Sequence, residues 1–150
     1  MVENIKIPVN ISISGTHVTD NDDSETFEKY SGFYSKRSDS VYIIYEDKNR
    51  CRNMIKVTEN KAELKRTFSK EKKSNDTPAR LEMADFIYIR GERTEGFYRT
   101  PYGILDIEIL TEDIKQEELI DIFKLNIKGN IKMNGSPVSD FVLKIEAAAL

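Results

Sequence analysis

The segment GILDIEILT, residues 103 to 111, limits most strongly what this chain can fold into. Leu105, Ile107 and Ile109 alternate in it with Asp106 and Glu108. Because successive side chains of a β-strand point to opposite faces, this alternation predicts a strand with one buried and one solvent-facing side. Water is the expected neighbour of the two carboxylates, although paired acids on one face also occur in glycosidases.

Other segments repeat the alternation. Residues 5 to 13 carry isoleucine or valine at every odd position. Pro8 lies within this run and has no N–H to donate, so we expect a strand edge or a break there. Residues 19 to 24 are polar and predict a loop. Short β-branched and aromatic runs then follow at close spacing, which is typical of a β-sandwich or a β-barrel.

Two tight turns predict antiparallel neighbours. Thr100-Pro101-Tyr102-Gly103 puts proline where φ near −65° is needed and glycine where φ must be positive, the pattern of a three-residue hairpin with a glycine bulge. Met133-Asn134-Gly135-Ser136 contains the Asn-Gly pair of a two-residue hairpin. We therefore predict a single all-β, antiparallel domain.

Two segments depart from simple alternation. In TEDIKQEELI, residues 111 to 120, acidic residues follow Thr111, which predicts one or two helical turns or, equally, a bend between two strands. In RLEMADFIYIR the apolar parity changes near Ala84 and Asp85, which predicts a bulge. Residues 86 to 89 are apolar on both faces, so we expect cover on both sides of that strand.

The composition restricts partners and compartment. The chain has 150 residues, enough for one domain with its own core, and a net charge of −3, which argues against a general nucleic-acid binder. The single cysteine, Cys51, cannot form an internal disulfide, the N-terminus has no signal-peptide pattern, and no apolar run approaches the roughly 18 residues of a membrane span. We expect a cytoplasmic domain, residues 1–146, with no membrane partner. Residues 147–150 resemble an expression-vector scar.

Most catalytic and metal chemistries lack their residues. His17 is the only histidine, so a zinc site or a histidine-based nucleophile would depend on it alone; we expect it to face solvent and Cys51 to be a small buried hydrophobe. The acidic run of residues 20–23 lacks the glycine and glutamate of a calcium loop. The basic run of residues 65–73 predicts a solvated hairpin end rather than a phosphate site. We predict no metal and no cofactor, and rank an enzymatic role third.

Tyrosines and arginines gather near the predicted strand ends. They can stack across strands and cover apolar surface with their stems, which is a structural role. Alternatively, they can line a barrel mouth in which phenols and guanidinium groups hold an anionic or amphipathic ligand. The candidate ligand-binding residues are Arg66, Tyr88, Arg90 and Arg99, with Tyr34 and Tyr98 stacking nearby.

Several segments together resemble one protein family. They are ETFE followed by GFY (residues 25–34), VYIIYED, MIKV, GER leading to FYRTPYG, the alternating ILDIEILT, and KLNIKGNIKMNG. In order and spacing they are similar to the YwiB-like family, a small bacterial group without an established reaction. The resemblance implies a calycin- or lipocalin-like up-and-down barrel of roughly 8–10 antiparallel strands in a bacterial cytosol. It transfers no catalytic residues.

Two functions remain. The first is a non-enzymatic barrel that binds a small, partly apolar or anionic molecule, since barrels of about eight strands can hold one ligand. The second is a protein-interaction or structural module, for example a homodimer, whose interior is filled by its own side chains. The apolar cover expected at residues 86–89 favours the second. Whether the interior is hollow or filled is the observation that would reduce the uncertainty between them most.

Overall fold

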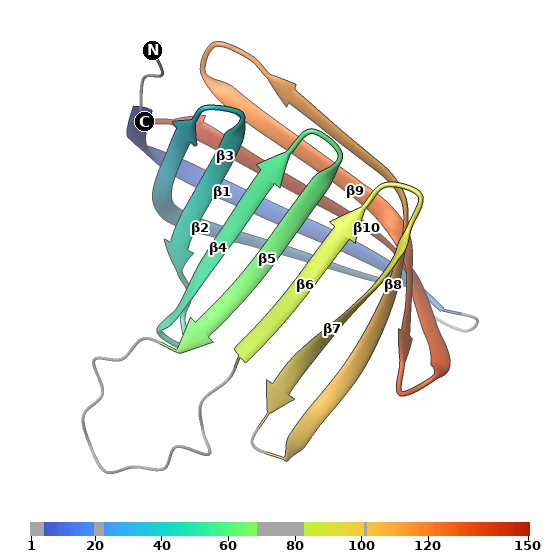
Figure 1. Cartoon of the computed structure of the whole chain (residues 1–150). Helices are drawn as coiled ribbons and strands as arrows, with labels where there is room; N and C mark the ends of the chain where they lie inside the picture. Colours follow the sequence, from blue (N-terminus) through green and yellow to red (C-terminus); the bar gives the residue numbers. More distant parts are fainter. Residues whose placement is uncertain (1–4, 20–22, 69–82, 101) are drawn as a thin grey trace.

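The computed structural model describes residues 5–19, 23–68, 83–100 and 102–150. Within these ranges every regular element is a β-strand: β1 (Ile5–Val18), β2 (Asp23–Arg37), β3 (Ser40–Glu46), β4 (Cys51–Thr58), β5 (Lys61–Phe68), β6 (Met83–Ile89), β7 (Arg93–Thr100), β8 (Gly103–Glu118), β9 (Ile122–Met133) and β10 (Ser136–Ala149). Each strand is antiparallel to the next, and β10 returns to β1, so the sheet closes into a barrel (Figure 1). The predicted all-β, up-and-down antiparallel barrel is confirmed.

Both predicted hairpins are present. The one between β9 and β10 turns at Asn134 and Gly135, whose φ angles are 48° and 86°, as a two-residue turn requires. Gly103 has the expected positive φ, 137°. It pairs with Thr100, however, so two residues rather than three connect β7 and β8. Pro101, one of those two, lies outside the described residues.

Of the two alternatives predicted for residues 111–120, the helical turns are wrong, because β8 continues as a strand to Glu118. The bend between two strands lies only at the end of the segment, where residues 119–121 connect β8 to β9. Thr111 and Ile114 turn into the barrel and are buried, and a register shift between Thr111 and Asp113 sets this spacing. Of the acidic residues that suggested a helix start, Asp113 lies opposite Lys128 of β9, and its Oδ1 is 3.3 Å from Arg90 Nε. Opposite charges directly across a sheet stabilise the strand pairing, so Asp113 favours a strand here.

The bulge predicted near Ala84 and Asp85 is also wrong for the pairing of β6 with β5, which keeps one register along the strand. No bulge is needed because β6 is apolar on both faces. Ala84 and Tyr88 are buried on the inner face, while Ile87 and Ile89 are half-buried on the outer face. The change of parity in the sequence therefore reflects two apolar faces and not an inserted residue.

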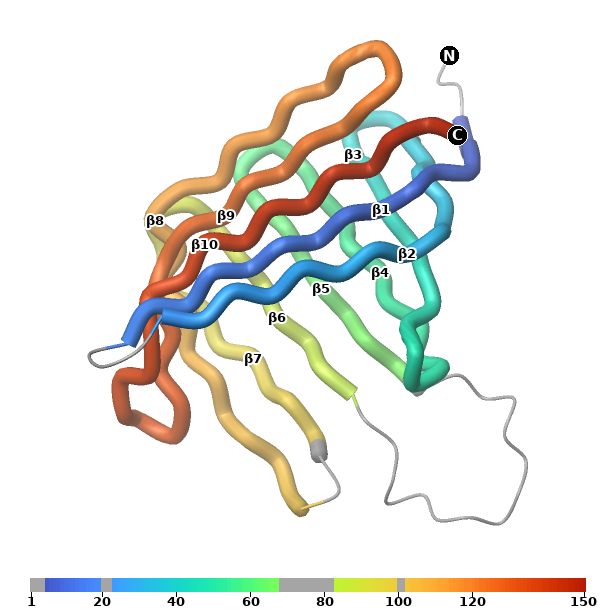
Figure 2. The backbone as a smooth tube through the Cα atoms, turned by 180° about the vertical axis from the view of Figure 1, so that it is seen from behind, coloured from blue at the N-terminus to red at the C-terminus, as the bar shows by residue number. Residues whose placement is uncertain are grey.

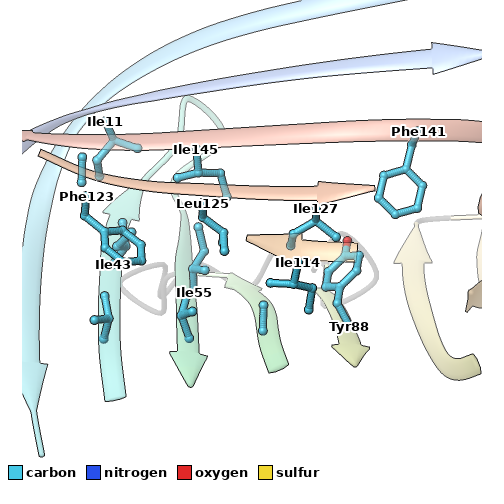
Figure 3. Packing of buried hydrophobic residues seen from close by; sticks show 14 of the residues in the cluster. Ile11, Ile43, Ile55, Tyr88, Ile114, Phe123, Leu125, Ile127, Phe141 and Ile145 are labelled. Atoms are coloured by element: carbon cyan, nitrogen blue, oxygen red, sulfur yellow. The ribbon is translucent and has the colours of Figure 1, made fainter. Parts of the chain in front are cut away.

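The interior of the barrel is filled by the chain's own side chains. Buried residues from opposite walls form one apolar cluster, and Figure 3 shows Ile11, Leu125 and Ile127 pointing toward the opposite wall. Ile11, Ile43 and Ile127 are each 0% exposed. Side chains that line an empty lumen stay in contact with water, whereas these are fully covered. Among the described residues the interior is thus a packed core.

Two long strands bend the sheet into a barrel. β2 pairs with β1 along its whole length but with β3 only from Gly32 to Arg37. β8 pairs with β7 up to Leu110 and with β9 from Ile107 onward. Both strands thereby pass from one half of the barrel to the other. Figure 2 shows β8, β9, β10, β1 and β2 side by side in one half, with the shorter strands behind them.

The barrel has two ends, which are named by their connections. The β3–β4 end also carries the β1–β2, β7–β8 and β9–β10 connections, and the β4–β5 end carries the β2–β3, β6–β7 and β8–β9 connections (Figure 1). Pro8 lies at the β4–β5 end, where pairing of β1 with β10 begins only at Val9, as expected for an edge or break. Residues 147–149, which resemble a vector scar, extend β10, and Ala147 is buried opposite Ile11.

Candidate functional site

The six residues predicted to share one ligand-binding mouth are divided between the two ends and the interior. Arg66, Tyr98 and Arg99 lie toward the β3–β4 end, Tyr34 and Arg90 lie at the β4–β5 end, and Tyr88 lies in the interior. Of these, Arg66 and Tyr98 contact each other. The single mouth expected from the sequence is therefore wrong, and each position has a different role.

Tyr88 belongs to the core. Its ring packs edge-on against Phe141 with the centroids 6.0 Å apart, and 7% of the residue is exposed (Figure 3). Burial raises the pKa of its hydroxyl. Arg99 lies on the exposed outer face of β7, opposite Met83 and Ile104. Tyr88 and Arg99 thus face opposite sides of the sheet and do not line a common cavity.

Tyr34 fastens β2 to the end of β8. Its hydroxyl donates to Glu118 Oε2 at 2.8 Å, and Lys36 Nζ lies 3.0 Å from the same carboxylate oxygen. The bond from Lys36 lowers the pKa of Glu118, and burial raises the pKa of Tyr34. The Tyr34 ring also rests 5.8 Å from the ring of Phe123. These side-chain contacts link β2 to β8 at the β4–β5 end of the barrel.

Arg90, which directly follows β6, links the end of that strand to β8. Its guanidinium donates to the carbonyl of Ile114, and its Nε lies 3.3 Å from Asp113 Oδ1. A hollow of about 640 Å³ opens beside it, lined mainly by polar and charged residues of the β4–β5 connection and of strands β8 and β9. Because both contacts of the Arg90 guanidinium are with residues of β8, we interpret the role of Arg90 at this end as structural.

The β3–β4 end holds the most organised polar cluster, centred on Asp47 and Arg66. Arg66 Nε donates to Asp47 Oδ2 at 2.9 Å, and the side chains are 19% and 11% exposed respectively. Arg66 Nη1 donates to the Tyr98 hydroxyl at 3.4 Å. Asn53 Nδ2 donates to Asp47 Oδ2 at 3.0 Å, and the N–H of Cys51 donates to Oδ1 at 3.0 Å. Together these bonds fix the guanidinium at the edge of the core.

The electrostatics of Asp47 follow from those contacts. Burial alone would raise its pKa, but the hydrogen bonds from Asn53, from the N–H of Cys51 and from Arg66 outweigh burial and hold the pKa below its usual value. Asp47 is therefore a carboxylate at neutral pH. It neutralises part of the charge of Arg66 and orients the guanidinium.

Two stacked tyrosines flank this cluster. Tyr30 of β2 and Tyr45 of β3 lie with ring centroids 4.6 Å apart and planes 19° apart. The Tyr30 hydroxyl donates to Glu28 Oε1 at 2.8 Å; burial and this bond raise its pKa to about 12. Burial also raises the pKa of Tyr45. Both phenols thus stay neutral and offer an aromatic wall beside the polar cluster.

A solvent-open hollow lies between the tyrosine pair and Arg66. Its volume is about 490 Å³, and it is lined by Glu28, Tyr30, Tyr45, Asp47, Lys48, Asn49, Asn53 and Arg66. Pockets for small ligands have volumes of roughly 300–1,000 Å³. The hollow combines cations, hydrogen-bonding amides and an aromatic wall, which suits binding. We call these eight residues the mouth pocket.

Comparison with known proteins gives the family. Residues 11–145 match the family described as Domain of unknown function (DUF1934). The chain belongs to the DUF1934 family. It is also similar to the structure described as the crystal structure of ywiB protein from Bacillus subtilis, with a TM-score of 0.78 and 16% identity, over 97% of this chain and 93% of that one. No curated protein matches. The resemblance noted in the sequence is confirmed, and at this identity the structural likeness shows the fold alone.

Sequence reasoning found one of the eight mouth-pocket residues of this DUF1934 barrel, Arg66, together with Tyr98, which contacts it, and missed the other seven. Asp47 was missed, although it opens a turn, Asp-Lys-Asn-Arg, in which aspartate commonly binds the backbone two residues on. Asp47 Oδ1 does accept the N–H of Asn49 at 2.9 Å. The sequence signal for this site was the pairing of an aspartate at the end of one strand, Asp47, with an arginine near the end of the next hairpin, Arg66. Tyr30 and Tyr45 carried none beyond their residue type.

The other predicted positions have mixed outcomes. His17 is half-buried rather than solvent-facing, with Nδ1 3.3 Å from Ser139 Oγ, because β1 runs on beside β10. Cys51 is buried, as predicted. Glu108 lies on the outer face, where its Oε2 is 3.1 Å from Arg93 Nε, so its carboxylate forms an ion pair and does not contact water alone. Residues 20–22 of the acidic run and 70–73 of the basic run lie outside the described residues. No described segment is a helix able to span a membrane.

Proposed function

We propose that this DUF1934 chain is a non-enzymatic binding protein that takes a small molecule with an anionic group into the mouth pocket. The observation that carries the proposal is Arg66, whose guanidinium is held by Asp47 and Tyr98 at the edge of a hollow with an aromatic wall. A guanidinium fixed before binding loses little rotamer freedom when it meets an anion, so its charge-assisted bond is retained as affinity.

The pocket also defines the shape of the ligand. Lys48 adds a second cation on the rim, whereas Asp47 and Glu28 are occupied by Arg66 and Tyr30. The anionic group belongs near Arg66 and Lys48, and a flat or apolar part belongs against the tyrosine pair. A long apolar tail has no room, because the interior beyond the pocket is filled. This differs from the sequence expectation of a ligand held inside the barrel.

The test uses the fluorescent probe anilinonaphthalene sulfonate, which carries both an anion and aromatic rings. We expect saturable binding that weakens as salt rises, because exposed charge pairs are screened. Arg66→Gln should weaken binding by roughly tenfold or more, since a charge-assisted bond is worth about 1.5–3 kcal/mol. Arg90→Gln, which also breaks an ion pair but at the β4–β5 end, is the matched control. Equal binding by Arg66→Gln and Arg90→Gln, at equal melting temperatures, would refute the mouth pocket.

A second candidate is a protein-interaction or structural module. The filled interior supports it, because a barrel without a lumen works through its surface. A protein that binds no small anion in the titration above and elutes with a partner or as a dimer would favour this second function. For either function the proposed setting is the cytoplasm of a bacterium, on the sequence grounds given above.

A further inference from the structure

One half of β2 is an open sheet edge. Residues 23–31 pair with β1 on one side, while pairing with β3 begins only at Gly32. Within the described ranges no strand pairs with the other side of residues 23–31. A strand edge with unpaired N–H and C=O groups is a template for another strand.

The direction of the backbone groups along this edge follows from Pro8. The Pro8 carbonyl accepts the N–H of Leu150 and therefore faces β10. The backbone carbonyl of Pro8 thus points away from β2. Its partner Phe33 then forms a non-hydrogen-bonded pair and points its own backbone away from β1. The β1–β2 register has no shift, so the same holds at every second residue back along β2. Glu25, Phe27 and Lys29 therefore direct their N–H and C=O groups to the open edge.

The side chains of these three residues are complementary to themselves. Phe27 is 63% exposed, and Lys29 Nζ lies 5.7 Å from the centre of its ring. In an antiparallel pairing centred on Phe27, Glu25 of one copy lies opposite Lys29 of the other, and Lys29 opposite Glu25. Among the described residues neither Glu25 nor Lys29 forms an ion pair within its own chain. Pairings centred on Glu25 or on Lys29 would instead set like charges against each other.

We propose that β2 is a self-association edge: two copies of this chain join through a two-fold antiparallel pairing of residues 25–29 centred on Phe27. Each of the three opposed pairs exchanges backbone hydrogen bonds, the two Phe27 rings meet on the axis, and two Glu25–Lys29 pairs set the register. The barrels then share one continuous sheet. The inference does not depend on a ligand in the mouth pocket, and self-association and probe binding are separate measurements.

Reciprocal charge reversal tests the register. In sedimentation velocity over a concentration series, the parent protein should dimerise, and Glu25→Lys or Lys29→Glu should each weaken dimerisation by about tenfold, because each places two like-charge pairs in the interface. The double variant restores both pairs and should restore dimerisation. Glu146→Lys, a reversal on the exposed outer face of β10, is the matched control and should leave the dimer unchanged. A parent protein that stays monomeric at every concentration, or a double variant no better than the singles, would overturn the proposal.

Disulfide trapping gives an independent reading of the same register. Directly opposed Cα atoms in a hydrogen-bonded antiparallel pair are about 5.5 Å apart, within the range for a disulfide. Phe27→Cys should therefore form a covalent dimer on mild oxidation. Ser31→Cys should not, because the two cysteines would lie about 27 Å apart along the strands. Cys51 is buried and does not compete. Equal trapping through both positions would contradict the pairing centred on Phe27.

Discussion

Asp47 organises the β3–β4 end of the barrel. It receives hydrogen bonds from two backbone N–H groups, from Asn53 and from Arg66, and so joins the β3–β4 turn to β5. Its pKa is held below the usual value by these donors. A carboxylate with a lowered pKa stabilises the fold above its unfolded pKa, near 3.9, and that stabilisation is lost as the pH falls through the folded pKa.

Asp47→Asn should therefore destabilise the protein in a pH-dependent way. At pH 7 the loss should be about 1–3 kcal/mol, because asparagine presents an NH₂ where Arg66 and Asn53 need an acceptor. As the pH falls below about 4 the unfolded parent chain takes up the proton first, and at lower pH the folded carboxylate does as well, so the difference between the two proteins should narrow. Urea unfolding at pH 7 and pH 3 measures both values. The same difference at the two pH values would show that the charge of Asp47 is irrelevant.

Thr111 of β8 is a buried polar residue that, unlike Asp47, is not satisfied by hydrogen bonds from the described residues. It is 0% exposed, and its Oγ1 has no hydrogen-bond partner among the described residues. A buried hydroxyl without a partner costs free energy, so Thr111→Val, which keeps the shape, should stabilise the barrel by about 1 kcal/mol. Thr94→Val is the matched control and should destabilise, because Thr94 Oγ1 donates to the carbonyl of Ile87. Urea midpoints of both variants give the signs, and a loss of stability in Thr111→Val would contradict this reading.

At the scale of elements, the strands approach most closely at glycines. A Cβ built on Gly129 of β9 would lie 2.1 Å from the carbonyl oxygen of Leu110 on β8. The same close approach occurs at Gly32, where a Cβ would lie 2.2 Å from the carbonyl oxygen of Ile44, at the point where β2 passes from one half of the barrel to the other. Glycine in a strand is typical of such bends.

Gly129→Ala should thus force β8 and β9 apart and destabilise the protein by about 1–3 kcal/mol. Gly15→Ala is the comparison, because its nearest neighbour is the Thr26 hydroxyl at 3.2 Å, an end of a side chain that is able to rotate away. Thermal unfolding of the two variants decides the matter. Similar losses in both would mean that backbone contact is not the cause.

The sequence predicted elements well where local pattern and burial agree. The alternation matched one buried face in residues 105–111 and, in the first strand, from Val9 onward, whereas Ile5 and Ile7 are exposed. The Asn134-Gly135 turn has the positive φ angles that its residue types predict. The prediction for residues 111–120 failed because the segment is held as a strand by its pairing with β9, and that register is not visible in the segment itself. The bulge predicted from the parity change near Ala84 is wrong because β6 is apolar on both faces, with Ile87 and Ile89 half-buried on the outer one.

At the scale of the whole molecule, the packed interior decides where function is located. A barrel with a hollow lumen can bind a ligand inside, but in this barrel Ile43 and Ile127 of the interior are fully covered by neighbouring side chains. Binding is left to the rims and outer edges, where the mouth pocket and β2 lie. Sequence pattern alone contains no measure of interior volume, because that volume depends on how side chains from opposite walls interdigitate. It therefore predicted Arg66 and Tyr98 but not the aspartate and tyrosines that make them a site.

The most direct test is an NMR titration of the isotope-labelled protein with anilinonaphthalene sulfonate. Backbone amides of Asn49 and Asn53 report on the mouth pocket, and methyl groups of Ile43, Leu125 and Ile127 report on the interior. We predict saturable shifts at the mouth pocket, absent in Arg66→Gln, with the interior methyl groups unchanged. Shifts centred on the interior methyl groups would show that the barrel opens to admit the ligand and would contradict the account.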